Sequence, residues 1–226
     1  MENSDVNVNI DESVYKCQTA KFKVREAKHF LEKLQTNEIQ KDEDLTTFYL
    51  NAFVTSASSV IDYVKSGFIY VKIKGPRINW KEWRNKDTRN EIINMHPQSK
   101  AITTFLTLYN NEKNNLLNIP LVNYFVYKRN KIIHQRWDGI KSVSSTEHPD
   151  GRVDIHKLTL EASYRLGLLE KVKDYDLDIC YKHIPKEQQK QLFTRLTHDH
   201  AIPILEEFVT TLEEFIKKFE GKNFFN

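Results

Sequence analysis

The stretch that decides the fold is residues 119–134, IPLVNYFVYKRNKIIH, which has the spacing of one amphipathic helix. Pro120 suits the first helical position, where its missing N–H costs no hydrogen bond. The apolar residues recur every three or four positions and share one face of a helical wheel at about 100° per residue. These residues are Leu121, Val122, Phe125, Val126, Ile132 and Ile133. The pattern therefore predicts a helix with one buried face.

Two polar residues near the end of this helix are the best functional candidates. Arg129 falls in the middle of the apolar stripe, about 80° from Leu121 on the wheel. A guanidinium there is costly unless it has a partner or faces a cleft. His134 falls with Asn130 on the adjoining polar edge, about 140° from Arg129. The end of the helix is therefore the first place to look for a site.

The composition bounds the class of protein. Of 226 residues, 39% are hydrophobic and 29% charged, enough for a sizeable core under a solvated surface. Six glycines and six prolines are few for the turns of a β-sandwich, and the residue content favours helices. The net charge of +3 permits an anionic partner without requiring one. Cys17 and Cys180 have no metal-binding or redox spacing and indicate a reducing compartment.

The chain has no feature of a membrane or secreted protein. No run approaches about 18 consecutive apolar residues, so we expect no transmembrane helix and no membrane partner. The first residues, MENSD, are polar and acidic, unlike a secretory signal. With the cysteine content, these features predict a cytoplasmic protein.

Helical periodicity extends over most of the chain. Helices are expected at about 17–36, 44–66, 79–93, 98–115, 186–197 and 199–219. We expect Asp44 and Asp199 to cap the second and the last of these. Gly67 is expected to end the second helix, whose apolar face is expected to include Phe48.

After the helix at 119–134 the helical period of apolar residues gives way to an alternation of apolar and polar residues. The turn signal Pro149-Asp150-Gly151 is followed by apolar residues at every second position. We therefore expect a small β insertion at 138–183, before the last helices. The predicted fold is mainly α: an antiparallel helical bundle in a single domain, residues 1–226, interrupted by this insertion.

The end of the helix at 119–134 resembles the signature of a known family. Arg129 and His134 are separated by four residues, and Asn130 directly follows the arginine. The HEPN superfamily of small helical domains carries such an arginine and histidine near the end of a bundle helix. The resemblance covers roughly residues 17–136 and 198–220, and leaves the β insertion outside it.

The resemblance implies a HEPN-like, metal-independent endoribonuclease. Such a protein needs no cofactor, and it would cleave single-stranded RNA at a cleft between two copies of the chain. His134 would act as base or acid, because histidine titrates near neutrality. Arg129 would clamp the phosphate through two hydrogen bonds, and Asn130 would orient the histidine or the phosphate. Positive charges beside the motif are the expected RNA contacts: Lys128, Lys131 and Arg136.

The family also includes prokaryotic toxins, so an antitoxin or another protein is a further expected partner. Members that pair with nucleotidyltransferase antitoxins tend to carry a tyrosine two residues after the histidine. This chain has Arg136 at that position, so nucleotide transfer there is not indicated.

A structural interpretation of the motif stays open. Arg129 would then pair with a carboxylate, and His134 would cap the helix C-terminus, which favours cationic side chains. The protein would be a non-catalytic HEPN-like module that binds RNA or a protein. The sequence therefore leaves open whether the chain is an enzyme.

Two further patterns in the sequence each allow a functional and a structural interpretation. Basic residues between Lys72 and Arg89 interleave with Trp80 and Trp83, a mixture that binds single-stranded RNA or forms a solvated helix face. His198-Asp199-His200 suggests a metal, but the two histidines would point about 200° apart on a helix. With no further ligands to name, we expect no metal site.

Overall fold

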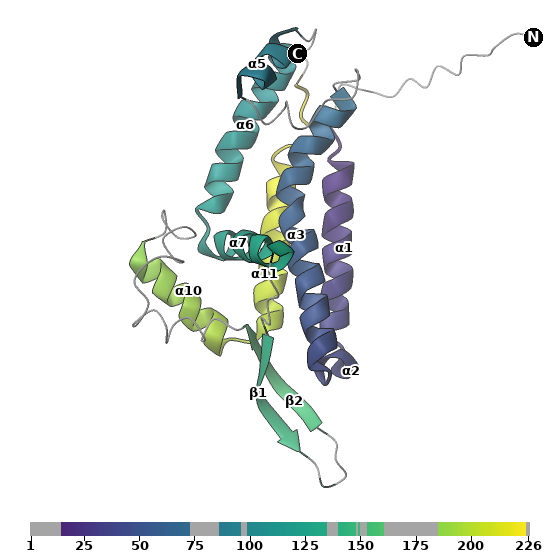
Figure 1. The fold of residues 1–226 in the computed structure, drawn as a ribbon, viewed down its shortest axis with the longest axis vertical. Coiled ribbons are helices and arrows are strands. Elements are labelled where there is room, and N and C mark those ends of the chain that lie inside the picture. Colours follow the sequence, from purple (N-terminus) through teal and green to yellow (C-terminus); the bar gives the residue numbers. More distant parts are fainter. Residues whose placement is uncertain are drawn as a thin grey trace, which may run out of the picture.

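The computed structural model describes residues 15–72, 86–95, 99–134, 140–147, 149, 153–160 and 185–224. These residues form eight helices and two strands in an elongated molecule (Figure 1). In chain order they are α1 (Gln18–Leu34), α2 (Asn37–Gln40), α3 (Glu43–Lys72), α5 (Lys86–Met95), α6 (Ser99–Leu117), α7 (Pro120–His134), β1 (Ile140–Glu147), β2 (Val153–Leu160), α10 (Lys186–His198) and α11 (Ala201–Lys217). The described chain is therefore mainly helical, as predicted. None of its described helices has the length and hydropathy needed to cross a membrane.

Three long helices, α1, α3 and α11, form the centre of the molecule (Figure 1). Lys21, near the start of α1, pairs with Glu220 beyond the end of α11. At the other end of α1, the Gln35 amide donates to Glu206 Oε1 at 3.0 Å. The residue numbers on the α11 side fall as those on the α1 side rise, so the two helices are antiparallel. These contacts place the chain in a bundle-like arrangement.

Helices α1 and α3 approach closely at Gly67. A Cβ added there would lie 2.4 Å from Thr19 Oγ1 and 2.8 Å from Tyr15 Oη. Tyr15 is buried, and its hydroxyl donates to the Val64 carbonyl oxygen at 2.8 Å. Gly67 therefore lies inside α3, which continues to Lys72, and the prediction that it ends the helix is wrong. The glycine makes room for a neighbouring helix rather than for a change of backbone direction.

Aromatic rings join α6 to α3 and α11. The rings of Phe68 and Phe105 stack with their centroids 3.8 Å apart, and the Phe105 ring is 5.7 Å from that of Phe219. One turn further along α6, the Tyr109 hydroxyl donates to the Ile61 carbonyl oxygen at 3.1 Å. Each of these rings is buried, so α6 is held to the centre by a continuous apolar layer.

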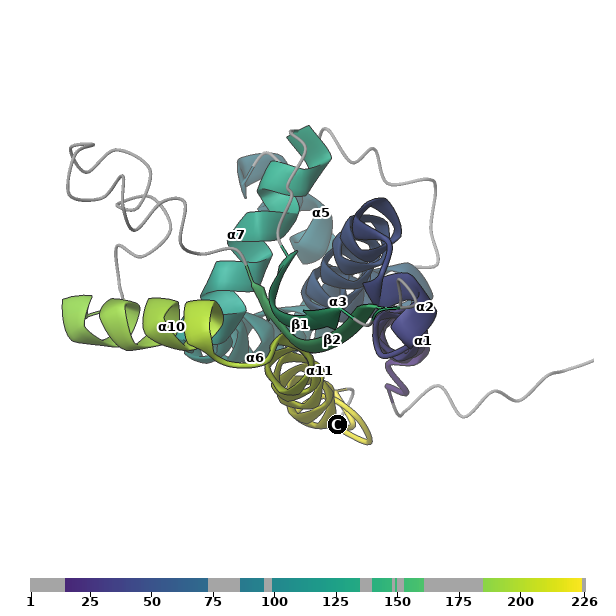
Figure 2. The ribbon, with the colours of Figure 1, turned by 90° about the horizontal axis from the view of Figure 1, so that it is seen from below.

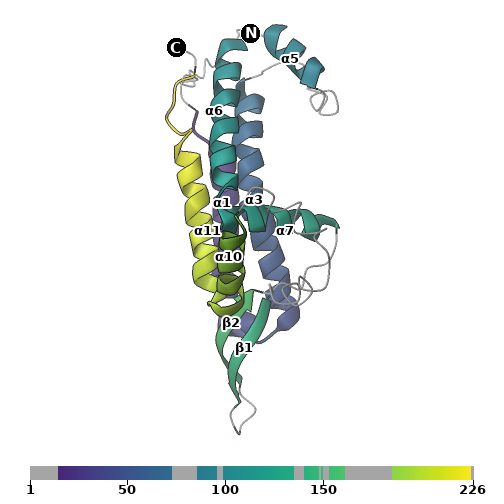
Figure 3. The ribbon, with the colours of Figure 1, turned by 90° about the vertical axis from the view of Figure 1, so that its left-hand side faces the viewer.

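Helix α7 runs across the long axis of the other helices, as Figure 3 shows. It begins at Pro120, the predicted first position. Ser58 Oγ on α3 donates to the Phe125 carbonyl oxygen at 3.3 Å, and the Phe125 ring stacks on that of Phe208, centroids 4.6 Å apart. Small side chains of α3 are buried around this crossing: Ser56, Ala57, Ser58 and Ser59. Their size allows α7 to lie against α3.

Strands β1 and β2 form an antiparallel hairpin, paired from Ile140 with Leu160 to Glu147 with Val153. Seen from below, the hairpin lies next to α11 and α2 (Figure 2). It falls within the stretch where the sequence predicts a β insertion. Residues 161–184 lie outside the described residues, so the extent of the insertion and the division of the chain into domains stay predictions.

Two helix caps differ from the expected ones. Asp42 caps α3 in place of Asp44, because its Oδ1 accepts from the Leu45 amide at 2.9 Å. His200 caps α11 in place of Asp199, because its Nδ1 accepts at 3.2 Å from the backbone N–H two residues later. Both predictions are wrong by one or two positions. Residue type identifies a capping segment, but the exact cap depends on which side chain reaches a free N–H.

The prediction that Phe48 lies on the buried face of its helix is also wrong. It is 60% exposed on α3, with its ring 5.3 Å from that of Tyr49. Periodicity predicts the side of a long helix that is buried, but not where along the helix its neighbours end.

Cys17 precedes α1 in an unusual environment. Its side chain is fully buried, and its φ of 48° lies in the left-handed region that few residues other than glycine adopt. Burial, together with the nearby Glu220 charge, raises the pKa of the Cys17 thiol to about 12. Because the thiolate is the nucleophile, Cys17 should be inert in the folded protein.

In a Cys180→Ser variant, native Cys17 is expected to react with Ellman's reagent at least about 100-fold more slowly than a free thiol. In denaturant the same thiol should react at the ordinary rate. Absorbance of the released thiolate measures both rates. Rapid reaction of the folded variant would contradict the burial of Cys17.

Candidate functional site

The predicted motif lies on the last turns of α7. Arg129 is described with its side chain, whereas Asn130, Lys131 and His134 are described as backbone of the helix only. His134 is the last residue of α7. Arg136, the remaining expected RNA contact, lies outside the described residues. The structure thus places the motif residues on one helix end, and the geometry of the site can be followed from Arg129.

Arg129 forms an ion pair with Asp62 on α3. Its Nη1 lies 2.7 Å from Asp62 Oδ2, and the Arg129 side chain is 22% exposed. The carboxylate of the pair is near the surface, since the Asp62 side chain is 57% exposed. Arg129 Nε is buried, and it has no hydrogen-bond partner among the described residues. Among the described residues the arginine therefore has a single, solvent-accessible partner, and that bond leaves other donors of its guanidinium unused.

Lys128, the residue before this arginine, has a different environment. It is only 8% exposed, and its Nζ lies 5.4 Å from the centroid of the Tyr124 ring, one turn earlier on α7. An ammonium over an aromatic face is stabilised by the negative potential of the ring. This contact gives Lys128 a packing role, and its contribution to RNA binding stays a prediction.

The sequence did not point to Asp62 as the partner of Arg129. Asp62 is the only acidic residue of α3 after Asp44, and this isolated carboxylate is the signal that the sequence offers. Its charge also reaches Tyr109 on α6: burial, and then the Asp62 charge, raise the pKa of the Tyr109 hydroxyl. Asp62 is therefore the point where α3, α6 and α7 interact electrostatically.

The two histidines near the start of α11 each form a contact with a backbone group. His198 Nδ1 lies 2.9 Å from the Thr194 carbonyl oxygen, and His200 caps α11. In the described part of the chain, no three His, Cys, Asp or Glu side chains are grouped to hold a metal ion.

No protein-family model matches the chain, and no curated protein or solved structure matches it significantly. The motif and the geometry around Arg129 are therefore the features that bear on function.

Proposed function

We propose that the protein is a HEPN-like, metal-independent endoribonuclease that cleaves single-stranded RNA at the end of α7. In this reaction the 2′-oxygen of a ribose attacks the neighbouring phosphorus, and the 5′-oxygen leaves. His134 removes the proton from the 2′-hydroxyl or delivers one to the leaving oxygen. Arg129 binds the phosphate oxygens, on which negative charge accumulates in the transition state.

The observation that carries the proposal is that Arg129 is mostly buried on α7 while the carboxylate that it binds is exposed. A guanidinium held on a buried helix face has limited freedom to move, so it is positioned in advance for a ligand. Asp62, its partner among the described residues, is well exposed and can return to water when a phosphate takes its place. The exchange of a carboxylate for a phosphate keeps the charge-assisted hydrogen bonds of Arg129.

The helical geometry bears on the number of chains in the site. Residues five apart in one regular helix point about 140° apart, so Arg129 and His134 of one chain do not face the same phosphate. We therefore propose a homodimer in which the two copies of α7 complete one cleft. His134 is the last residue of α7, so it lies where a second copy of the helix can approach it.

Replacing Arg129 by alanine is expected to lower the rate of RNA cleavage by about 10²–10³-fold, because a donor to the transition-state phosphate is lost. The measurement is the cleavage of a labelled single-stranded RNA in the presence of a chelator. The matched control is Arg195→Ala, which removes an arginine that is similarly paired with Glu207 between α10 and α11. Equal activity of the Arg129→Ala variant and the wild type would refute the proposed role.

The second candidate is a non-catalytic HEPN-like module that binds RNA or a protein. The ion pair between Arg129 and Asp62 favours it, because the pair links α7 to α3 without any ligand. This candidate predicts that the wild type binds its partner but cleaves no RNA. It also predicts that dimerisation or binding survives the His134→Ala substitution.

A further inference from the structure

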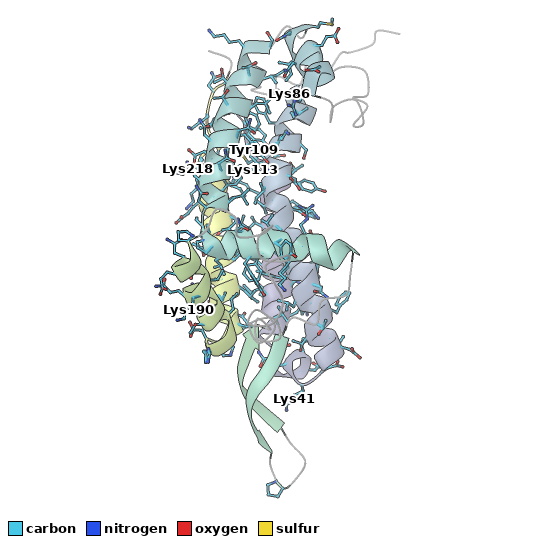
Figure 4. All side chains as sticks on the ribbon, turned by 60° about the vertical axis from the view of Figure 1, so that its left-hand side comes forward. Lys41, Lys86, Tyr109, Lys113, Lys190 and Lys218 are labelled. Carbon is cyan, nitrogen blue, oxygen red and sulfur yellow. The ribbon has the colours of Figure 1, made fainter. Side chains whose placement is uncertain are left out.

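Two cationic side chains from different helices lie over the Tyr109 ring, and the charge of a third, on α5, acts on one of them. Lys65 on α3 and Lys113 on α6 each place Nζ 5.9 Å from the centroid of the Tyr109 ring. Figure 4 shows the labelled side chains of Tyr109 and Lys113 between α6 and α3. Arg89 on α5 is close enough for its charge to act on Lys65. We call Lys65, Arg89 and Lys113 the cationic cluster.

The cluster is not neutralised within the described protein. All three side chains are partly buried, and none has a carboxylate at ion-pair distance among the described residues. Burial, followed by the charges of Arg89 and Lys113, lowers the pKa of the Lys65 ammonium, while Asp62 acts in the opposite direction. Asp62 is already paired with Arg129. Gathering three like charges in this way costs folding free energy, which an anionic ligand would recover.

The cluster continues the site at the end of α7. Asp62 and Lys65 are three residues apart on α3, a rise of about 4.5 Å along the helix axis. The partner of Arg129 is thus less than one helical turn from the first cation of the cluster. Arg129 on α7, Lys65 on α3 and Lys113 on α6 are thus linked through Asp62 and Tyr109, and the charge of Arg89 on α5 acts on Lys65. We call these four groups the cationic path.

We infer that this path binds the phosphodiester backbone of a single-stranded RNA and leads the strand to Arg129. The inference rests on the proposed function for the nature of its ligand. Phosphates that follow one another along a strand match a row of cations better than a single small anion does. The contacts are to phosphates rather than to base edges, so the cluster contributes affinity without sequence preference.

The test is the binding of a fluorescent 2′-O-methyl RNA strand, which has no free 2′-hydroxyl and cannot be cleaved. Fluorescence anisotropy is measured over a range of salt concentrations for the wild type and for a variant with Lys65→Met, Arg89→Gln and Lys113→Gln. Loss of three phosphate contacts should weaken binding about tenfold or more and lower the salt-dependence slope by about 2.

The matched control removes three other cations and so changes the net charge equally. It carries Lys33→Gln, Lys41→Gln and Lys190→Gln, substitutions of exposed lysines on α1, before α3 and on α10. Lys41 and Lys190 are labelled in Figure 4, away from Tyr109. The control should keep the wild-type slope. Equal weakening in both triple variants would overturn the inference, because it would show an effect of net charge alone.

Thermal unfolding separates a binding defect from a folding defect. Removing mutually repelling charges should leave the melting temperature of the cluster variant unchanged or higher. If the triple variant does not fold, Lys65→Met alone is used. It keeps an apolar contact with the Tyr109 ring and should lower the slope by about 0.7. An unchanged slope in that variant would also overturn the inference.

These measurements distinguish a failure of the cluster to bind RNA from a failure of the proposed ribonuclease activity. A wild type that binds the strand through the cluster but cleaves no RNA would support the cluster and reject the ribonuclease. Cleavage of RNA by a protein whose salt slope is unaffected by the cluster substitutions would do the reverse.

Discussion

Replacement of Gly67 by alanine is expected to lower the free energy of unfolding by about 2 kcal/mol. In an open helix the same change would stabilise by about 1 kcal/mol, because alanine favours the helical backbone. Here the new methyl group would lie 2.8 Å from Tyr15 Oη and nearer still to Thr19 Oγ1. Thr19 is exposed and can rotate away, but Tyr15 is buried and held by its bond to the Val64 carbonyl. The clash with Tyr15 therefore decides the sign of the effect.

A double-mutant cycle isolates this clash. Tyr15→Phe removes the hydroxyl that the new methyl group would meet, at the cost of about 1 kcal/mol for a lost hydrogen bond. The Gly67→Ala change should then cost less in the Tyr15→Phe background than in the wild type, with a coupling of about 1 kcal/mol. Urea denaturation measures all four proteins. Strict additivity, or stabilisation by Gly67→Ala alone, would contradict the close contact of α1 and α3.

Replacement of His134 by alanine is expected to lower the cleavage rate by about 10²–10⁴-fold, the range typical of a lost general acid or base. Binding of an uncleavable strand should change little, because the proposed role of His134 is in proton transfer. Single-turnover cleavage and anisotropy measure the two effects separately. A loss of affinity that matches the loss of rate would indicate a binding role instead.

His198→Ala is a matched control for this substitution. Like His134, His198 is the last residue of a helix, in this case α10. Its removal reproduces the loss of an imidazole from a helix C-terminus without touching the motif. The control should retain wild-type cleavage. Equal losses in the two variants would mean that the effect on rate comes from helix stability.

The helices with a continuous buried face could be predicted from sequence alone. Helix α11 buries the apolar residues spaced three and four apart from Ile204 to Ile216, and α7 begins at the predicted Pro120. Periodicity suffices there because a neighbour covers the same face over many turns. The sequence mispredicts Gly67 and Phe48, because their environments depend on where α1 lies against α3 and on where along α3 this contact ends. That information is tertiary and is not contained in the local pattern.

The candidate site was predictable only in part, for a similar reason. An arginine in an apolar stripe indicates that a partner exists, but it does not name the partner. Asp62 is 67 residues from Arg129 in the sequence, and only the crossing of α3 and α7 brings the two together. The cationic cluster is harder to predict, because its three members come from three helices and the local sequence around each one does not distinguish it from a surface cation.

The most direct test of the proposed function compares an RNA strand with a DNA strand of the same sequence. Both are incubated with the purified wild-type protein in the presence of a chelator. We expect the RNA to be cut, leaving 2′,3′-cyclic phosphate ends, and the DNA to stay intact, because DNA lacks the attacking 2′-hydroxyl. Intact RNA, or cleavage of both strands alike, would contradict the assignment of a metal-independent ribonuclease to Arg129 and His134.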